Sequence, residues 1–206
     1  MHNARETIHP RWLRTTHWIN ALSVVILTMS GWQIYNAAPF FDLYFPKAIT
    51  LGGWLGGALQ WHFAAMWLLA ANGLIYLACN VASGRLRSQF FPLSVKAVLT
   101  DFMAALRGRL SHTDPRHYNA VQRAAYAGVI CVIVVLVLSG LAIWKPVQFQ
   151  GLASLMGGFE GARWVHFIAM ALVVLFVAVH VAMVALVPRT LLPMFTGRAS
   201  QTGQGG

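Results

Sequence analysis

Long apolar stretches dominate the chain, and short polar segments separate them. Four stretches contain no Asp, Glu, Lys or Arg, namely residues 15–41, 48–84, 124–144 and 164–188. A helix needs about 20 mostly apolar residues to cross a hydrocarbon core of roughly 30 Å. Because the stretches lack the alternation of barrel strands, they indicate helices, which satisfy their own backbone hydrogen bonds in lipid. We predict four membrane spans, at about residues 18–35, 61–82, 124–144 and 164–187.

The composition agrees with this pattern. Hydrophobic residues make up 58% of the 206-residue chain and charged residues only 10%, whereas a soluble domain carries roughly 25% charged residues. A soluble globular enzyme and a disordered chain are both excluded. We expect an all-α, integral membrane four-helix bundle over residues 1–195, surrounded by the lipid bilayer. The small, polar residues 196–206 are predicted to form a disordered tail.

Basic residues predict the orientation of the spans. Of the 15 Lys and Arg residues, 12 fall in the amino-terminal segment, in the connection between spans two and three, or in the tail. The two other connections hold only Lys47, Lys145 and Arg163. Because positive charge is retained in the cytoplasm, both termini are predicted to be cytoplasmic. The net charge of +10 therefore reflects topology and anionic lipid rather than a nucleic-acid partner.

The connection between spans two and three contains a further helical pattern. Across residues 92–110, apolar residues recur at helical spacing at Val95, Val98, Leu99, Phe102, Met103 and Leu106. Basic residues occupy other positions of the same segment, among them Lys96 and Arg107. This pattern predicts an amphipathic helix on the inner surface of the membrane.

Four of the eight histidines lie inside the predicted spans or at their ends: His17, His62, His166 and His180. An ionisable group at membrane depth is costly, so such residues indicate a functional site. His166 and His180 are 14 residues apart, which places them near one helical face and about 21 Å apart along the axis. They therefore belong to two separate sites. The predicted topology pairs His17 with His180 at the inner level and His62 with His166 at the outer level.

Two imidazoles at each level suit the two axial positions of a haem iron. Zinc would require three or four ligands, and the predicted spans contain no carboxylate for a di-iron site. The chain has no CxxCH motif, so covalent haem attachment is excluded. The expectation is two non-covalent b-type haems, with His17, His180, His62 and His166 as iron ligands.

Two glycines and two arginines are candidates for further haem contacts. Gly31 shares nearly one helical face with His17, and Gly73 shares nearly one with His62, so each glycine could make room for the haem of the other level. Arg14 and Arg163 each stand three residues before a predicted ligand and are candidate partners of haem propionates. Helix packing would equally explain the glycines, and topology would equally explain the arginines.

The histidine layout resembles a known family. One histidine in the first span, one in the second and a pair 14 apart in the fourth are typical of the cytochrome b subunits of membrane-bound nickel-iron hydrogenases and respiratory formate dehydrogenases. The opening HPRWLRTTHWINALSVVILTMSGW and the run HYNAVQRAAY, residues 117–126, are similar to segments of that family. The resemblance covers nearly the whole chain, from about His9 to Pro188.

The resemblance implies a multi-pass, di-haem cytochrome of the bacterial inner membrane. Such a protein passes electrons between the quinone pool and an outer-face oxidoreductase, either a periplasmic hydrogenase or a molybdenum-containing enzyme. It would be the quinone-reactive subunit of a complex rather than a stand-alone enzyme. By the same resemblance, the quinone pocket lies near the inner haem, at positions matching Asn119 and His180.

Two other classes of function remain open from the residues alone. A self-contained membrane oxidoreductase, such as a quinone-linked superoxide oxidase or a metal reductase, would use the same haems and act at the outer one. A small transporter or metal-binding membrane protein is disfavoured because the spans contain no charged residue or broken-helix Gly/Pro pair midway through the membrane.

Overall fold

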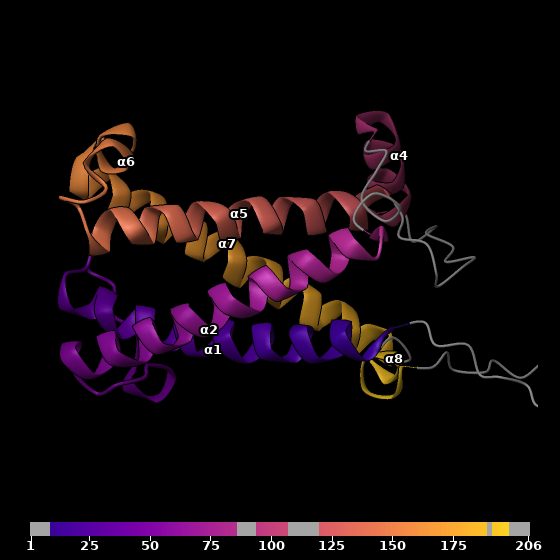
Figure 1. Cartoon of the computed structure of the whole chain (residues 1–206), viewed down its shortest axis with the longest axis horizontal. Helices are drawn as coiled ribbons and strands as arrows, with labels where there is room; N and C mark the ends of the chain where they lie inside the picture. Colours follow the sequence, from indigo (N-terminus) through magenta and orange to yellow (C-terminus); the bar gives the residue numbers. More distant parts are fainter. Residues whose placement is uncertain (1–8, 86–93, 107–119, 189–190, 198–206) are drawn as a thin grey trace, which may run out of the picture. The chain divides into compact units, whose positions relative to one another are not determined.

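The computed structural model describes residues 9–85, 94–106, 120–188 and 191–197 (Figure 1). These residues form helices and their connections, with no strand among them, which confirms the all-α prediction. The chain divides into two compact units, one of Met1–Ser83 with Val187–Gly206 and one of Gly84–Leu186. Each unit is built around one antiparallel pair of long helices.

The first hairpin consists of α1 (Arg11–Ala37) and α2 (Leu55–Ala82). Buried residues recur at every seventh position along the contact between these helices, and all except Asn72 are small: Thr16, Ser23 and Ser30 on α1, and Ala58, Ala65 and Asn72 on α2. Small side chains let two helix backbones approach closely, which is how helices associate when no hydrophobic effect drives them together. This small-residue seam defines the register of the first hairpin.

The hydroxyl groups of the seam are satisfied within α1 itself. Thr16 Oγ1 donates to the Trp12 carbonyl at 2.9 Å, Ser23 Oγ to Ile19 at 2.8 Å, and Ser30 Oγ to Ile26 at 2.7 Å. A hydroxyl on a helix commonly bonds the carbonyl four residues earlier in this way. The seam is therefore polar in composition without leaving these buried hydroxyls unpaired.

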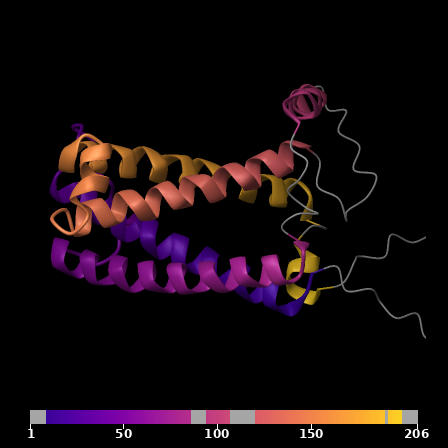
Figure 2. The same ribbon diagram turned by 45° about the horizontal axis from the view of Figure 1, so that its top comes forward.

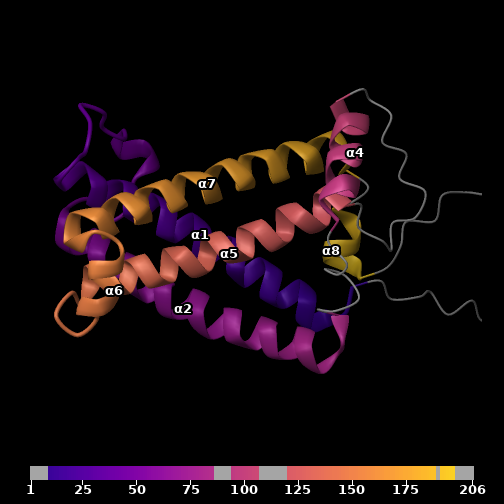
Figure 3. The same ribbon diagram turned by 90° about the horizontal axis from the view of Figure 1, so that it is seen from above.

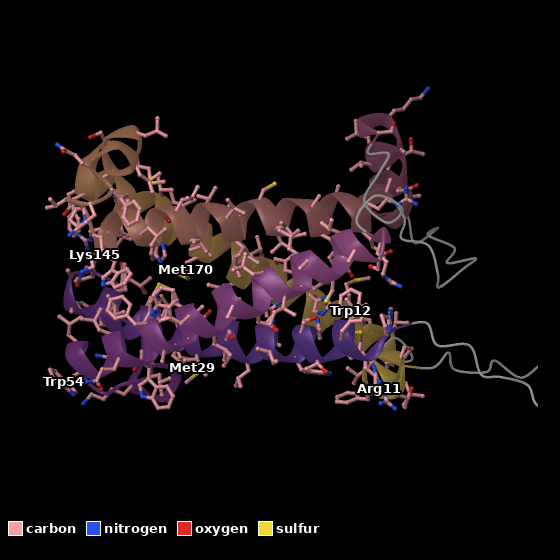
Figure 4. The ribbon with its side chains drawn as sticks, viewed as in Figure 1. Arg11, Trp12, Met29, Trp54, Lys145 and Met170 are labelled. Atoms are coloured by element: carbon pink, nitrogen blue, oxygen red, sulfur yellow. The ribbon has the colours of Figure 1, made fainter. Side chains whose placement is uncertain are left out.

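Residues 38–54 connect α1 to α2 and pack over the end of α1. The Asn36 side chain donates to the Phe45 carbonyl and accepts from the Phe45 N–H, each at 2.9 Å. The Trp32 ring stacks on the Phe45 ring with 4.7 Å between centroids. Figure 4 places Trp54 in this region and Arg11 and Trp12 at the opposite end of α1. We call the end with the short connection the loop end of a hairpin and the other the open end.

The short helix α8 (Leu192–Thr196) returns to the open end of α1. The Trp18 ring stacks on Phe195 at 4.8 Å, and the Arg14 guanidinium donates to the Phe195 carbonyl. Gly197 ends α8 in the left-handed conformation, at φ 77°. Thr196 and Gly197, which the sequence assigned to the tail, thus belong to this helix and its cap, and residues 198–206 lie outside the described residues.

The second hairpin consists of α5 (Ala120–Trp144) and α7 (Gly158–Leu186), and its buried residues are Ser139, Ala142, Ala162, Ala169 and Val173. The helix α6 (Gln150–Leu155) lies in its loop and buries Ala153 against Ala142 and Ala162 (Figure 3). Gly157 and Gly158 adopt φ values of 88° and 83°, which only glycine accepts readily. A side chain at Gly161 would collide with the Met156 carbonyl, so this turn requires glycine at three positions.

The helix α4 (Val95–Leu106) lies transverse to α5, and Figure 2 shows it nearly end-on. Asp101 Oδ2 accepts a hydrogen bond from the Ala120 N–H, the first of α5, at 2.8 Å. A carboxylate at a helix amino terminus offsets the positive end of the helix dipole. The structure confirms a helix within the predicted segment 92–110. Its position on a membrane surface stays a prediction, with Leu99 and Met103 exposed on one face.

Among the described helices, α2, α5 and α7 are long and apolar enough to cross a membrane. The predicted spans 61–82 and 124–144 lie within the first two, and the span 164–187 ends one residue beyond α7. The helix α1 has 27 residues and includes the predicted span 18–35, but it is too polar to meet the same standard. The chain therefore has three candidate membrane spans, and its fourth span, its multi-pass topology and its four-helix bundle stay predictions.

Candidate functional site

All four span histidines lie on the long helices. His62 occupies the loop end of the first hairpin, near the start of α2, and His17 occupies the open end, near the start of α1. In the second hairpin, His166 occupies the loop end of α7 and His180 its open end. Each hairpin therefore provides one histidine at each of its two ends.

The loop-end histidine of the first hairpin is held by a serine on the facing helix. Ser30 Oγ lies 3.0 Å from His62 Nδ1, and Ser30 is fully buried. The only hydroxyl hydrogen of Ser30 points to the Ile26 carbonyl at 2.7 Å, so Oγ must accept from the imidazole. His62 therefore carries its proton on Nδ1, and its lone pair is on Nε2, the nitrogen that would face a bound iron.

The second hairpin repeats this arrangement with different neighbours. Ser139 Oγ lies 3.0 Å from His166 Nδ1 and 2.7 Å from the Val135 carbonyl, which takes its hydrogen. His166 Nδ1 also lies 3.1 Å from the Leu136 carbonyl, a group that can only accept. Both contacts assign the proton to Nδ1 and the lone pair to Nε2, as in His62.

A glycine follows each of these serines and faces the histidine ring. A Cβ on Gly31 would lie 3.5 Å from His62 Cε1, and one on Gly140 would lie 3.3 Å from His166 Cε1. Gly31 was predicted to make room for a haem, and here it adjoins the imidazole of a predicted ligand. A Cβ on Gly73 would meet no atom within 4 Å, so α2 leaves open space there. The role of both glycines at a haem stays a prediction.

These contacts fit a haem ligand set. A ligating histidine is neutral, and its second nitrogen usually donates to a carbonyl, carboxylate or other acceptor that orients the ring. His62 and His166 each have such a partner at Nδ1. Across residues 9–85, 94–106, 120–188 and 191–197, no three His, Cys, Asp or Glu side chains gather into a metal site. Two-histidine ligation of a haem requires no such cluster.

The open end of the first hairpin contains a polar cross-link beside His17. Asn72 Nδ2 donates to the Thr16 carbonyl at 2.8 Å and to Asn20 Oδ1 at 2.6 Å, and Asn72 is only 4% exposed. Thr16 precedes His17 directly, so this amide fixes the segment of α1 that contains the histidine. The His17 ring also meets the Trp18 ring edge-on at 5.3 Å.

Aromatic rings surround the histidine at the open end of the second hairpin. The His180 ring lies nearly parallel to Phe176, at 6.0 Å between centroids and 8° between planes. Phe176 in turn meets Tyr126 of α5 edge-on at 6.3 Å. This aromatic row joins α5 to His180 within the apolar part of the hairpin.

The remaining predicted residues have the following positions. Arg14 donates to the Phe195 carbonyl of α8, and Arg163 pairs with Glu160 at 2.9 Å near the loop end of α7. Figure 4 shows Lys145 at that same loop end. The propionate role of both arginines stays a prediction. Asn119, the predicted quinone contact, lies outside the described residues.

Sequence reasoning missed Ser30, Ser139, Gly140 and the amide of Asn72. The sequence prediction rested on ionisable groups in the spans, and none of these side chains ionises. A signal was present for the serines, since a Ser-Gly pair occurs once in the first predicted span and once in the third. Asn72 interrupts a row of small residues at every seventh position, which marks it as facing the neighbouring helix.

Comparison with known proteins gives consistent results. The family model described as prokaryotic cytochrome b561 matches residues 8–197. A protein of Azospira oryzae named as a putative protein-methionine-sulfoxide reductase subunit, YedZ1, is 65% identical over 190 residues, covering 92% of this chain and 96% of that protein. A probable Ni/Fe-hydrogenase B-type cytochrome subunit of Cupriavidus necator is 27% identical over 185 residues, covering 82% of this chain and 74% of that protein.

Proposed function

The chain belongs to the prokaryotic cytochrome b561 family, membrane electron-transfer proteins with b-type haem, and we propose that it is the di-haem, quinone-linked subunit of an outer-face oxidoreductase. The observation that carries this proposal is the pair of serine-held histidines, one per hairpin, both with the lone pair on Nε2. A b-type haem supplies one-electron exchange at its iron. The residues of this chain determine where the haems are held and what they contact.

His62 and His166 would hold the outer haem. Both stand at the loop end of their hairpins, and the distribution of basic residues assigns both loops to the outer side. His17 and His180, which stand at the two open ends, would hold the inner haem. The 14 residues from His166 to His180 correspond to about 21 Å of helix, which separates the two haems across the membrane core.

Quinone binds at the inner level, close to His180. Asn119 immediately precedes α5, and its side-chain amide offers both a donor and an acceptor to a quinone carbonyl. At this end of the second hairpin, Phe176 and Tyr126 provide an apolar, aromatic surface beside His180, which suits a planar ring. Asp101 of α4 bonds the first N–H of α5 and so stabilises the start of that helix. Protons exchange with the cytoplasm from this level.

The outer partner is an enzyme that reduces methionine sulfoxide in proteins. Support comes from the relative with 65% identity over nearly its whole length, which is named as a subunit of such a reductase. A quinol releases two electrons and two protons, and reduction of a sulfoxide to a thioether consumes two of each and releases water. The electrons therefore flow outward. The hydrogenase partner suggested by sequence is favoured less, because that relative shares only 27% identity.

Haem content and ligand assignment test this function directly. The purified protein should contain two b-type haems per chain by pyridine haemochrome analysis. His62→Ala and His166→Ala should each remove the same haem, and His17→Ala and His180→Ala should each remove the other. Trp61→Phe, beside His62 but exposed, is the matched control and should keep both haems. One haem per chain, or a His62→Ala variant that loses the same haem as His17→Ala, would contradict the two-level pairing.

The partner is tested by coupling the two half-reactions. Protein reduced by quinol in vesicles should be reoxidised by the matching reductase subunit together with a peptide containing methionine sulfoxide. Free methionine-containing peptide, without the sulfoxide, is the control. Reoxidation by a hydrogenase and protons, in place of the sulfoxide reductase, would overturn the partner assignment while leaving the haems unaffected.

A further inference from the structure

Two helix pairs of unrelated composition build the same arrangement around a histidine. In each hairpin the first helix contains a fully buried serine followed by glycine, and the second helix contains the histidine. The serine to imidazole distance is 3.0 Å in both, and the serine hydrogen points to a carbonyl four residues earlier at 2.7 Å in both. The glycine then faces the same ring atom, Cε1. We call the two residues of each arrangement the Ser-Gly pair.

We infer that Ser30 and Ser139 are positioning residues of the outer haem that fix the ligating nitrogen of His62 and His166 and lower the reduction potential of that haem. The inference rests on the proposed function, because it takes these two histidines as the outer ligands.

The orientation of the serine hydroxyl leaves one choice of imidazole tautomer. Its hydrogen is committed to a helix carbonyl, so its oxygen can only accept, and the imidazole must donate from Nδ1. The other tautomer would place two lone pairs opposite each other in a buried site and leave both unsatisfied, which costs about 1–3 kcal/mol. Nε2 is thereby kept as the ligating nitrogen before any haem binds.

An acceptor at Nδ1 also changes the ligand electronically. It withdraws the N–H proton slightly and makes the imidazole a stronger donor to the iron. A stronger donor favours the ferric form over the ferrous form, so the potential falls. Hydrogen bonding beyond the axial ligands is one of the ways in which a protein tunes a haem. In this chain two such serines would act on one haem, each through one of the two histidines that would hold it.

The glycine after each serine limits where the imidazole ring can lie. Its absent Cβ leaves ordinary contact distance to Cε1 at Gly31 and a tighter one, 3.3 Å, at Gly140. An alanine at Gly140 would require the His166 ring to shift by a few tenths of an ångström, whereas an alanine at Gly31 would make ordinary contact with the His62 ring. The Ser-Gly pair therefore supplies both the acceptor and the space, and neither residue alone would define the position of the histidine.

Substitution of each serine tests the inference, with the potential of the outer haem as the readout. Ser30→Ala and Ser139→Ala should keep two haems and a low-spin EPR signal. Ser30→Ala should raise the ratio of reduced to oxidised outer haem about tenfold at fixed ambient potential, or about 59 mV for one electron. Ser139→Ala should raise this ratio less, because the Leu136 carbonyl still accepts from His166 Nδ1. Because the serines act through separate ligands on separate helices, the two shifts should add in the double variant. The potential of the inner haem should not change.

Two variants separate the effect of the serine hydroxyl from the effect of side-chain size. Ser30→Thr keeps the acceptor and should restore the wild-type potential, since the same seam already accommodates Thr16. Ser23→Ala is the matched control, because Ser23 is equally buried, lies seven positions earlier on α1 and donates to the Ile19 carbonyl at 2.8 Å. It should leave both potentials unchanged.

The outcomes distinguish this inference from the proposed function. Unchanged outer potentials in both alanine variants, or a Ser30→Thr variant that behaves like Ser30→Ala, would overturn the serine role and leave the di-haem assignment intact. If Ser30→Ala loses haem, retention by Ser30→Thr supports the inference and loss from both overturns it. The proposed function fails separately, if His62→Ala and His166→Ala do not remove one and the same haem.

Discussion

The two hairpins each position a histidine at the loop end, but different residues pack their helices together. In α1 and α2 the contact is a seam of hydroxyls, alanines and one amide, whereas in α5 and α7 it is formed by Ser139, three alanines and a valine. Their loop ends nevertheless hold a histidine in the same way. Their open ends differ, since an asparagine cross-link adjoins His17 and an aromatic row adjoins His180. The position of the histidine at the loop end thus depends locally on one Ser-Gly pair.

The contrast also separates two sources of stability. The first hairpin contains the less apolar helix, α1, and relies on hydrogen bonds that cross from α2 to α1. The second hairpin contains two strongly apolar helices, and a turn of tightly packed glycines connects them through α6. Substitutions in the polar seam and in the glycine turn should therefore destabilise the protein by different mechanisms.

The largest effect on stability is expected in the turn of the second hairpin. Gly161→Ala would bring a Cβ into the Met156 carbonyl, and a backbone atom cannot move aside cheaply. We expect a loss of about 3 kcal/mol, at the upper end for overpacking. The measurement is resistance to unfolding by SDS in mixed micelles. Gly151→Ala, in the adjoining α6 with no atom within 4 Å of its Cβ, is the control and should be neutral.

The polar seam of the first hairpin should be the next most sensitive region. Asn72→Ala removes the bonds to the Thr16 carbonyl and Asn20, and we expect it to cost about 1–2 kcal/mol in thermal stability in detergent. The coupling to Asn20 is measured with Asn20→Ala and the double variant. Asn80→Ala is the control, because the Asn80 amide donates to Tyr76 of its own helix at 2.8 Å. An equal loss in both variants would show that the cross-link contributes nothing specific.

A smaller effect is expected where α4 meets α5. Asp101→Asn keeps a possible acceptor but removes the charge at the start of α5, and we expect a loss of about 0.5 kcal/mol that diminishes as salt is added. Hydrogen exchange of the first turn of α5 should report the change. Thr100→Ala is the control, because its hydroxyl bonds the Lys96 carbonyl of α4 itself. A salt-independent loss would contradict an electrostatic contribution.

The comparison of hairpins shows what the sequence could and could not predict. Hydrophobic stretches located the long helices, because backbone satisfaction in lipid leaves few alternatives. Histidine spacing led to the cytochrome b resemblance, which the family match confirms. The contacts around the histidines depend on which residue of the neighbouring helix stands opposite each ring. The pattern of residues within one helix does not reveal how its positions align with those of its neighbour. Ser30 and Asn72 were missed for this reason, although the repeat of small residues at every seventh position marks the face on which both lie.

The smallest effect on stability, and the sharpest test of an open role, concerns the arginines that precede a histidine in each hairpin. Arg163 stands three residues before His166 and pairs with Glu160, whose side chain is 67% exposed. Such an exposed pair contributes less than about 0.5 kcal/mol, so Glu160→Gln should be silent in stability and in both haem potentials. If Arg163 also binds a haem propionate, Arg163→Gln should lower the outer potential, because it removes a positive charge that favours the reduced haem.

Arg14 is the counterpart in the first hairpin, three residues before His17, but its guanidinium donates to the Phe195 carbonyl. Arg14→Gln should therefore destabilise the contact between α8 and α1 and shift the inner potential less than Arg163→Gln shifts the outer one. Equal shifts in the two variants would show that both arginines act through the haems, and no shift in either would remove both from the propionate sites.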